Sequence, residues 1–325
     1  MVCSSEIPFT WEYYSEIKED TTELVLLAIT AVCTALVILI FLEEVVFLRR
    51  NVAQTKKKAK TICMLGLYPV VAVMAFVGVL VPRSITIVNL VAYSYVCVCI
   101  FVFLSLLLDY FGGDSGIIRE LAEKKVALNT LPLCCCCICL PETILNRRSL
   151  KIFKIFAYQI IIIRPCILFA TAVLWNNGMN THKVDFASPI VYINILGGIS
   201  TVASVYGIGI IARATLAHLP GRYIRPKFIS LQLVIMLLGI QILLFNILAG
   251  RSLPPCSGTR DSYVRATILE NEILTWEMLL LSLLARYGYR RVEEGAGNEL
   301  VDSERGNKVI NIYEKEVNVN DTKTF

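Results

Sequence analysis

Seven long apolar stretches divide this chain of 325 residues, and they constrain its fold more than any other feature. A helix that crosses the ~30 Å hydrocarbon core of a bilayer needs about 20 mostly apolar residues. Each stretch is close to that length or longer. The sequence therefore predicts an all-α membrane protein, a seven-transmembrane helix bundle. The seven stretches are residues 24–42, 61–81, 84–108, 155–174, 188–211, 228–249 and 266–285.

The positions of Lys and Arg predict the orientation of this bundle. Twenty positive residues follow the first, third, fifth and seventh spans close to the membrane, whereas six lie on the other side. Because Lys and Arg accumulate on the cytoplasmic side, we expect the N-terminus outside and the C-terminus in the cytoplasm. The chain then divides into a short extracellular segment 1–23, a transmembrane domain 24–285 with a cytoplasmic loop 109–154, and a cytoplasmic tail 286–325.

The sequence offers little material for catalysis. Only 18% of the residues are charged, whereas soluble domains have about 25%. His182 and His218 are the only histidines, too few for a histidine metal site or proton relay. Nucleotide loops, nucleophile elbows and kinase signatures do not occur. We therefore expect no enzyme activity, no cofactor, no metal and no nucleic-acid partner.

Five cysteines lie within six positions of the predicted loop 109–154, between Pro132 and Pro141. Stable disulfides are disfavoured in the cytoplasm, and zinc sites use ligand pairs separated by a turn, usually with a second pair elsewhere. Thiols beside a membrane are candidates for S-acylation, which would attach the loop to the inner leaflet. A metal site and an unmodified apolar loop are the alternatives. The candidates for acylation are Cys134, Cys135, Cys136, Cys137 and Cys139.

Residues 116–128, just before this cluster, place their apolar side chains largely on one helical face. That pattern predicts a helix that lies in the membrane interface. Helix and cysteine loop together would form a membrane-attached cytoplasmic platform.

Arg164 is an ionisable residue in the middle of the fourth span, next to Pro165. Such residues are expensive in a membrane and are functional candidates for that reason. Glu270 and Glu277 in the seventh span are about 20° from sharing a direction, so either one is a candidate partner for Arg164. Two interpretations stay open: an ion pair that fixes helix packing, or a cation that binds the anionic group of a substrate.

The fifth and sixth spans carry polar or small residues that favour helix packing. Gly197, Ser200, Thr201, Ser204 and Gly207 form a stripe of small side chains, which predicts close approach of a neighbouring helix. Polar residues of the sixth span are more often interhelical hydrogen-bond partners than ligand contacts.

Residues in order along most of the chain resemble the organic solute transporter alpha-subunit family and, more distantly, related seven-span proteins. The N-terminus and the tail do not share this resemblance. The matching residues are Phe41-Leu42-Glu43-Glu44, Asn51, Val81-Pro82-Arg83-Ser84, Phe111-Gly112-Gly113, the cysteine cluster, Gln159, the basic residue at 164, Ile193-Asn194, Gly198-Ile199-Ser200-Thr201, Arg213, His218-Leu219, Lys227-Phe228, Gln232, Gln241, Glu277, Arg286 and Arg290-Arg291.

The resemblance implies a facilitative carrier that moves bile acids, conjugated steroids and similar amphipathic anions down their gradients. It also implies a single-span beta subunit as partner, contact with membrane lipids, and a basolateral plasma membrane in polarised epithelia. A mostly apolar solute suits a groove of aliphatic side chains with few polar contacts. The candidate substrate-binding residues are Arg164, Gln159, Asn194, Gln241 and Glu277.

Two other classes of protein remain as alternatives. One is a seven-span protein that organises lipid or trafficking without solute flux. The other is a G-protein-coupled receptor, which would have an Asp-Arg-Tyr-like triplet after the third span, a proline motif in the seventh, and an outer disulfide at the third span. Here the third span ends Leu108-Asp109-Tyr110, and Cys3 and Cys256, the expected outer cysteines, are not beside it.

Overall fold

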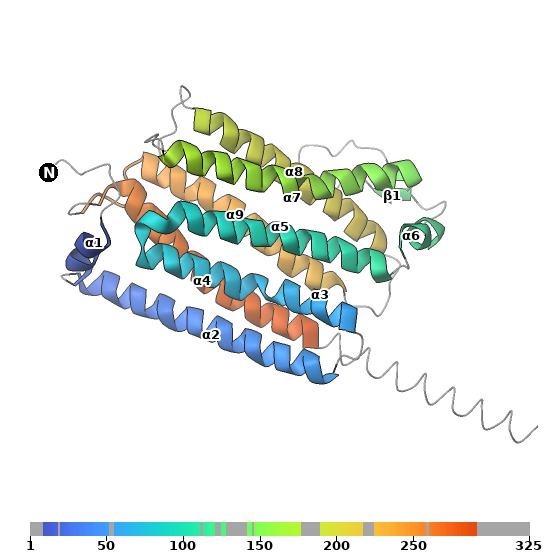
Figure 1. Ribbon diagram of the computed structural model, residues 1–325, viewed down its shortest axis with the longest axis horizontal. Helices are drawn as coiled ribbons and strands as arrows, with labels where there is room; N and C mark the ends of the chain where they lie inside the picture. Colours follow the sequence, from blue (N-terminus) through green and yellow to red (C-terminus); the bar gives the residue numbers. More distant parts are fainter. Residues whose placement is uncertain are drawn as a thin grey trace, which may run out of the picture.

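The computed structural model is an elongated bundle of helices that run roughly along its long axis (Figure 1). It describes residues 9–18, 20–51, 55–110, 113–120, 125–127, 142–144, 146–176, 189–216, 224–257 and 260–290. In chain order the helices are α1 (Thr10–Ile17), α2 (Thr21–Asn51), α3 (Thr55–Leu65), α4 (Leu67–Leu80), the 3-10 turn η1 (Pro82–Ser84), α5 (Ile85–Tyr110), α6 (Asp114–Glu120), α7 (Arg147–Asn176), α8 (Pro189–Leu216), α9 (Ile224–Gly250) and a last helix at 262–290.

Six helices in the described part of the chain are long and apolar enough to cross a membrane, so the helical membrane architecture predicted from the sequence is confirmed to that extent. The helix 262–290 contains the seventh predicted span but is not among the six, because Glu270, Glu272 and Glu277 stand in its middle. A seventh span remains a prediction. The six are Thr21–Asn51, Lys58–Leu80, Pro82–Asp109, Arg147–Leu174, Val191–Thr215 and Lys227–Gly250.

The two ends of the bundle carry different small elements (Figure 1). We call them the α1 end and the α6 end. At the α6 end, β1 (Lys125–Ala127) pairs antiparallel with β2 (Glu142–Ile144), with Val126 opposite Thr143. The predicted interfacial helix over 116–128 is therefore wrong at residues 125–127, which form a strand. Val126 and Thr143 are β-branched residues that favour extended backbone, and their pairing overrides the helical pattern of the apolar residues.

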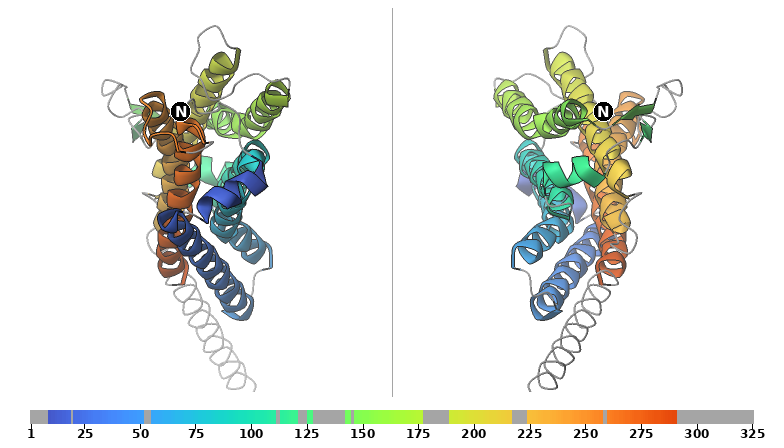
Figure 2. Two further views of the ribbon diagram at one scale, coloured as in Figure 1. Left: turned by 90° about the vertical axis from the view of Figure 1, so that its left-hand side faces the viewer. Right: turned by 90° about the vertical axis from the view of Figure 1, so that its right-hand side faces the viewer.

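The helix 262–290 packs against several other helices. Asn271 packs against Gly78 of α4, and the Tyr289 hydroxyl lies 3.9 Å from the Met64 sulfur of α3. Seen from the two ends, this helix and α9 occupy one side of the bundle, while α2 to α5 occupy the other (Figure 2). Of its three glutamates only Glu272 is buried, whereas Glu270 and Glu277 are half-buried.

The main hydrophobic core joins side chains from every helix from α2 to α9 and from the last helix. Ile100, Phe103 and Leu104 of α5 are fully buried within it. α5 is thus the central apolar helix, against which both α4 and α7 pack.

Candidate functional site

Arg164 lies where α5, α7 and α8 meet. Its guanidinium carbon is 4.5 Å from the centre of the Tyr93 ring of α5, a distance typical of a cation–π contact. On the α8 side the guanidinium lies against Gly197, where an added Cβ atom would be only 2.9 Å from Nη1 of Arg164. The charge is therefore held between an aromatic face and a glycine backbone.

The expected ion pair of Arg164 with Glu270 or Glu277 does not form. Within the residues that the structure describes, no carboxylate lies within ion-pair distance of Arg164. Glu277 instead accepts a hydrogen bond from Nε2 of Gln241 on α9, and Glu270 lies near Tyr93, the residue on which Arg164 stacks. The two glutamates thus lie on the last helix as expected, but neither of them pairs with Arg164.

The close packing of α7 against α8 confirms the prediction from the stripe of small residues. The Ser204 hydroxyl donates to the carbonyl of Ala157 at 3.0 Å, and Nε2 of Gln159 is 3.4 Å from the carbonyl oxygen of Ser200. Gly207 brings the two backbones so close that a Cβ atom there would lie 2.7 Å from the Phe153 carbonyl oxygen. The Gln159 side chain therefore contributes to the contact between α7 and α8 in the structure.

The predicted substrate-binding residues fall into two groups. Arg164 and Gln159 lie on α7 against α8, whereas Gln241 and Glu277 join α9 to the helix 262–290. Asn194 lies on α8, but its side chain is outside the described residues. The cysteine cluster at 134–139 also lies outside them. Among the described residues no group of three or more His, Cys, Asp or Glu side chains is placed to hold a metal ion.

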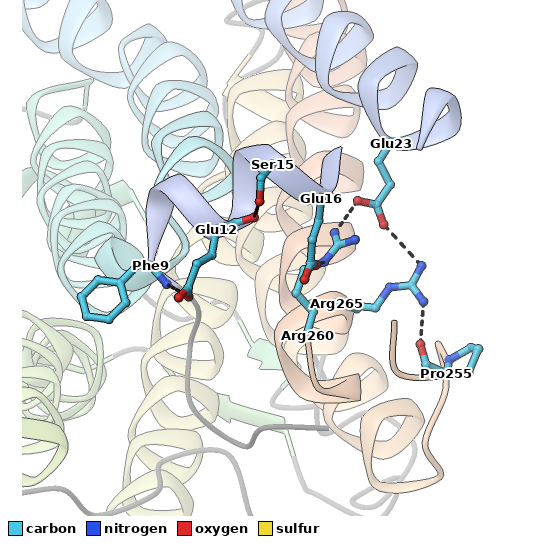
Figure 3. A network of polar contacts seen from close by, with 8 residues as sticks. All are labelled: Phe9, Glu12, Ser15, Glu16, Glu23, Pro255, Arg260 and Arg265. Atoms are coloured by element: carbon cyan, nitrogen blue, oxygen red, sulfur yellow. Dashed lines mark hydrogen bonds and ion pairs between the residues drawn. The ribbon is translucent and has the colours of Figure 1, made fainter. Parts of the chain in front are cut away.

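A polar network at the α1 end holds α1 against the loop that precedes the last helix (Figure 3). Nε of Arg260 lies 3.0 Å from Oε2 of Glu16, and its Nη1 pairs with Glu23. Arg265 lies 3.4 Å from the other oxygen of Glu23 and donates to the carbonyl of Pro255. We call Glu16, Glu23, Arg260 and Arg265 the α1 clasp. Only 4% of the Arg260 side chain is exposed, so these charges are largely protected from solvent.

The electrostatics of the clasp follow from this burial. Desolvation lowers the pKa of the Arg260 guanidinium, but hydrogen bonds and charge from Glu23 and Glu16 outweigh it, and the pKa lies above its ordinary value. Beneath the arginine, the Tyr13 ring centre is 5.7 Å from the guanidinium carbon. Burial raises the pKa of the Tyr13 hydroxyl. Arg260 therefore stays charged and Tyr13 neutral at physiological pH.

The helix α1 was not predicted from the sequence, where residues 1–23 were expected only to form a short extracellular segment. Two signals were present. Tyr13 and Ile17 are four residues apart, and both are 2% exposed in the structure. Glu12 reaches back to accept a hydrogen bond from the Phe9 backbone N–H at 3.0 Å, the contact typical of a helix start.

A second charged cluster links the first and last long helices towards the opposite end of the bundle. Arg290 bonds Oε1 of Glu44 at 2.7 Å and Oε1 of Glu43 at 2.6 Å, and Arg286 bonds Glu43 at 2.6 Å. The Glu44 side chain is 2% exposed. We call these four residues the terminal clamp. All four belong to the residues that carry the family resemblance, so parts of the sequence far apart meet in space.

Comparison with known proteins gives consistent relatives over most of the chain. The family model "Organic solute transporter Ostalpha" matches residues 26–294. Organic solute transporter subunit alpha of Danio rerio is 30% identical over 293 residues, which cover 90% of this chain and 89% of the relative. The Homo sapiens protein of the same name is 28% identical, with 85% and 83% covered. The organic solute transporter alpha-like protein of Drosophila melanogaster is 31% identical, with 87% and 84% covered. No solved structure matches.

Proposed function

The chain belongs to the organic solute transporter Ostalpha family, and from that premise we propose that it moves bile acids, conjugated steroids and similar amphipathic anions down their gradients. The family is one of transporters and not of enzymes. The six apolar helices make the chain a multi-pass membrane protein. The substrate class and the direction of flux are the parts that we propose.

Arg164 is the observation that carries the proposal. A cation inside an apolar bundle is costly and is usually neutralised by a nearby carboxylate. Here the described residues give Arg164 an aromatic face and a glycine backbone instead. A guanidinium without an acidic partner can accept a sulfate or carboxylate through paired hydrogen bonds. Apolar residues beside it, such as Ile167, suit a steroid body.

We also propose that the helix 262–290 is the seventh span, with the N-terminus outside and the C-terminus in the cytoplasm. Its 29 residues extend about 43 Å at ~1.5 Å per residue, enough to cross a bilayer. The Gln241–Glu277 hydrogen bond provides one of its glutamates with a partner inside the bundle. The excess of Lys and Arg on one side supports the orientation, and by analogy with the family we also propose a basolateral plasma membrane in polarised epithelia.

The partner that we propose is a single-span beta subunit. Vertebrate relatives are named "subunit alpha", which describes one component of a complex. The Drosophila melanogaster and Caenorhabditis elegans relatives are named "alpha-like". Efflux of a labelled steroid sulfate from cells, measured with and without a co-expressed beta subunit, tests this requirement. Equal efflux in the two cases would remove the beta subunit from the proposal.

Purified protein in proteoliposomes tests the role of Arg164. We expect Arg164→Ala to lower the uptake of a labelled steroid sulfate at sub-saturating concentration by about 10- to 100-fold. That range corresponds to the loss of hydrogen bonds to a charged group, about 1.5–3 kcal/mol. Arg164→Lys keeps the charge but loses the planar paired geometry, so we expect an intermediate flux.

Arg148 is the matched control, because it is an exposed arginine on the same helix. Arg148→Ala should transport like the wild type. If Arg164→Ala loses flux only in proportion to its loss of folded protein, Arg164 serves packing. If the wild type itself gives no flux with any amphipathic anion, with or without the beta subunit, the lipid-organising alternative replaces the carrier.

A further inference from the structure

Cys256 lies in the loop between α9 and the last helix, at the α1 end of the bundle, and it is disulfide-bonded. Its side chain is exposed. The residues around it are fixed by hydrogen bonds. Ser257 and Arg260 exchange two backbone hydrogen bonds, at 3.2 Å and 3.0 Å, and the Ser262 hydroxyl donates to the Pro254 carbonyl at 2.6 Å. Cys256 is therefore held next to the α1 clasp.

The free thiols of the chain exclude several cysteines as the disulfide partner of Cys256. The chain has 12 cysteines. Those in the described helices are free thiols, so none of them is the partner of Cys256: they are Cys33, Cys63, Cys97, Cys99 and Cys166. What remains is Cys3 and the cluster at 134–139.

The position of the cluster in the fold excludes it. Every cysteine of the cluster is at most seven residues from β1 or β2, which limits its reach to about 25 Å at ~3.5 Å per residue. Both strands lie at the α6 end (Figure 1). The 27 residues of α9, which lead to the loop of Cys256, are about 40 Å long. The cluster cannot reach across the bundle.

Cys3 precedes α1 in the sequence, and α1 lies at the same end of the bundle as Cys256. Cys3 precedes Phe9, the first residue of the described part, by six positions, a span of up to about 21 Å. α1 begins directly after Phe9 and is bound to the loop of Cys256 through the Arg260–Glu16 ion pair (Figure 3). Chain length thus allows Cys3 to meet Cys256 without crossing the bundle.

We propose that Cys256 is joined to Cys3 by a disulfide that tethers the N-terminus to the loop before the last helix. Bond formation couples two thiols with the loss of two protons and two electrons. The electrons pass by thiol–disulfide exchange to a disulfide-carrying oxidoreductase of the secretory pathway. Because such bonds persist in oxidising compartments, the α1 end of the bundle faces the extracellular side. This inference does not depend on which solute the protein carries.

The bond also gives α1 an attachment besides its non-covalent contacts. The α1 clasp holds Glu16 and Glu23 through Arg260, and Arg83 of η1 lies 3.5 Å above the Phe9 ring. The disulfide secures the chain on the other side of Phe9. α1 is thereby fixed from both of its ends.

Peptide mapping of the full-length protein tests the pairing directly. Protein purified from membranes without reductant, with its free thiols alkylated, is digested with trypsin. Cleavage after Lys18, Arg251 and Arg260 gives one peptide of residues 1–18 and another of residues 252–260. We expect mass spectrometry to find them as one linked species, which separates on reduction. Finding Cys256 alkylated before reduction, or linked to the peptide 126–147, would overturn the proposal.

Cysteine variants provide an independent measurement on intact cells. In the Cys256→Ser variant a membrane-impermeant maleimide should label the freed thiol of Cys3, and in the Cys3→Ser variant it should label the freed thiol of Cys256. In the wild type neither cysteine should be labelled. Cys166→Ser is the matched control, because Cys166 is an exposed free thiol on α7 and its loss leaves the linked peptides unchanged. Absence of labelling in both single variants at normal surface expression would place this end of the bundle on the other side of the membrane.

Discussion

Replacing Gly207 of α8 with alanine measures how much stability depends on the contact between α7 and α8. A Cβ atom at Gly207 would lie 2.7 Å from the carbonyl oxygen of Phe153 and 3.0 Å from the backbone nitrogen of Ala157. Both are backbone atoms of α7, so they can move away only if the helix itself shifts. Overpacking of this kind costs about 1–3 kcal/mol.

Gly198 provides the matched control on the same helix, because a Cβ atom there meets nothing within 4 Å. Alanine increases helix propensity over glycine by about 1 kcal/mol at either position. That gain cancels when the two variants are compared. We therefore expect the free energy of unfolding of Gly207→Ala to be about 1–3 kcal/mol below that of Gly198→Ala.

The assay is unfolding of the purified protein by SDS in mixed detergent micelles, followed by far-UV circular dichroism. Gly207→Ala should lose its helical signal at a lower SDS fraction than Gly198→Ala. A Gly207→Val variant should lose it at a still lower fraction, because its side chain is larger. If the alanine variants unfold at the same SDS fraction, the close approach of α7 and α8 is refuted.

Three further changes probe the polar contacts and the cysteine loop. Arg260→Ala should lower the free energy of unfolding by about 1–3 kcal/mol, because it leaves the carboxylate of Glu23 poorly paired in a largely buried site. Arg265→Ala is the control at a more exposed pair, and in the same SDS titration it should lower the free energy of unfolding by less than about 1 kcal/mol. Gln241→Leu should lower the free energy of unfolding by about 1–3 kcal/mol, because it leaves Glu277 without its hydrogen-bond donor, and the double variant Gln241→Leu/Glu277→Met should recover part of this loss. If the double variant loses as much stability as the two single variants together, the side chains do not interact directly. Serine at all five cysteines of 134–139 should abolish incorporation of a labelled fatty acid and reduce surface delivery or transport, and unchanged labelling would rule out acylation there.

The helices were predictable from the sequence because lipid-length apolar stretches leave a chain few alternatives. Their ends were less so. The first apolar stretch stops at Leu42, yet α2 continues to Asn51. Glu43 and Glu44 interrupt the hydropathy but not the helix, because their carboxylates are paired with arginines 243 to 247 residues later in the chain. Reading one helix at a time cannot reveal such partners.

The candidate site shows the same limit. Arg164 was identifiable as a mid-span cation, but its neighbours depend on how helices are arranged around the bundle. The angle between Glu270 and Glu277 shows that both lie on one face of the last helix. It does not show which other helix packs against that face. Tyr93 carried no special signal, since one tyrosine in an apolar span is common. Its role emerges only when α5 is placed against α7.

The terminal clamp has a consequence for the synthesis of the protein. Glu44 emerges early in translation, but Arg290 follows it by 246 residues. At about 5–20 residues per second, the first long helix waits on the order of 10–50 s for its partner. During that interval one acidic end of α2 must be kept in contact with water or with the insertion machinery. The contact between the first and last long helices therefore forms only after the last helix has been synthesised, and it is one of the last contacts that complete the fold.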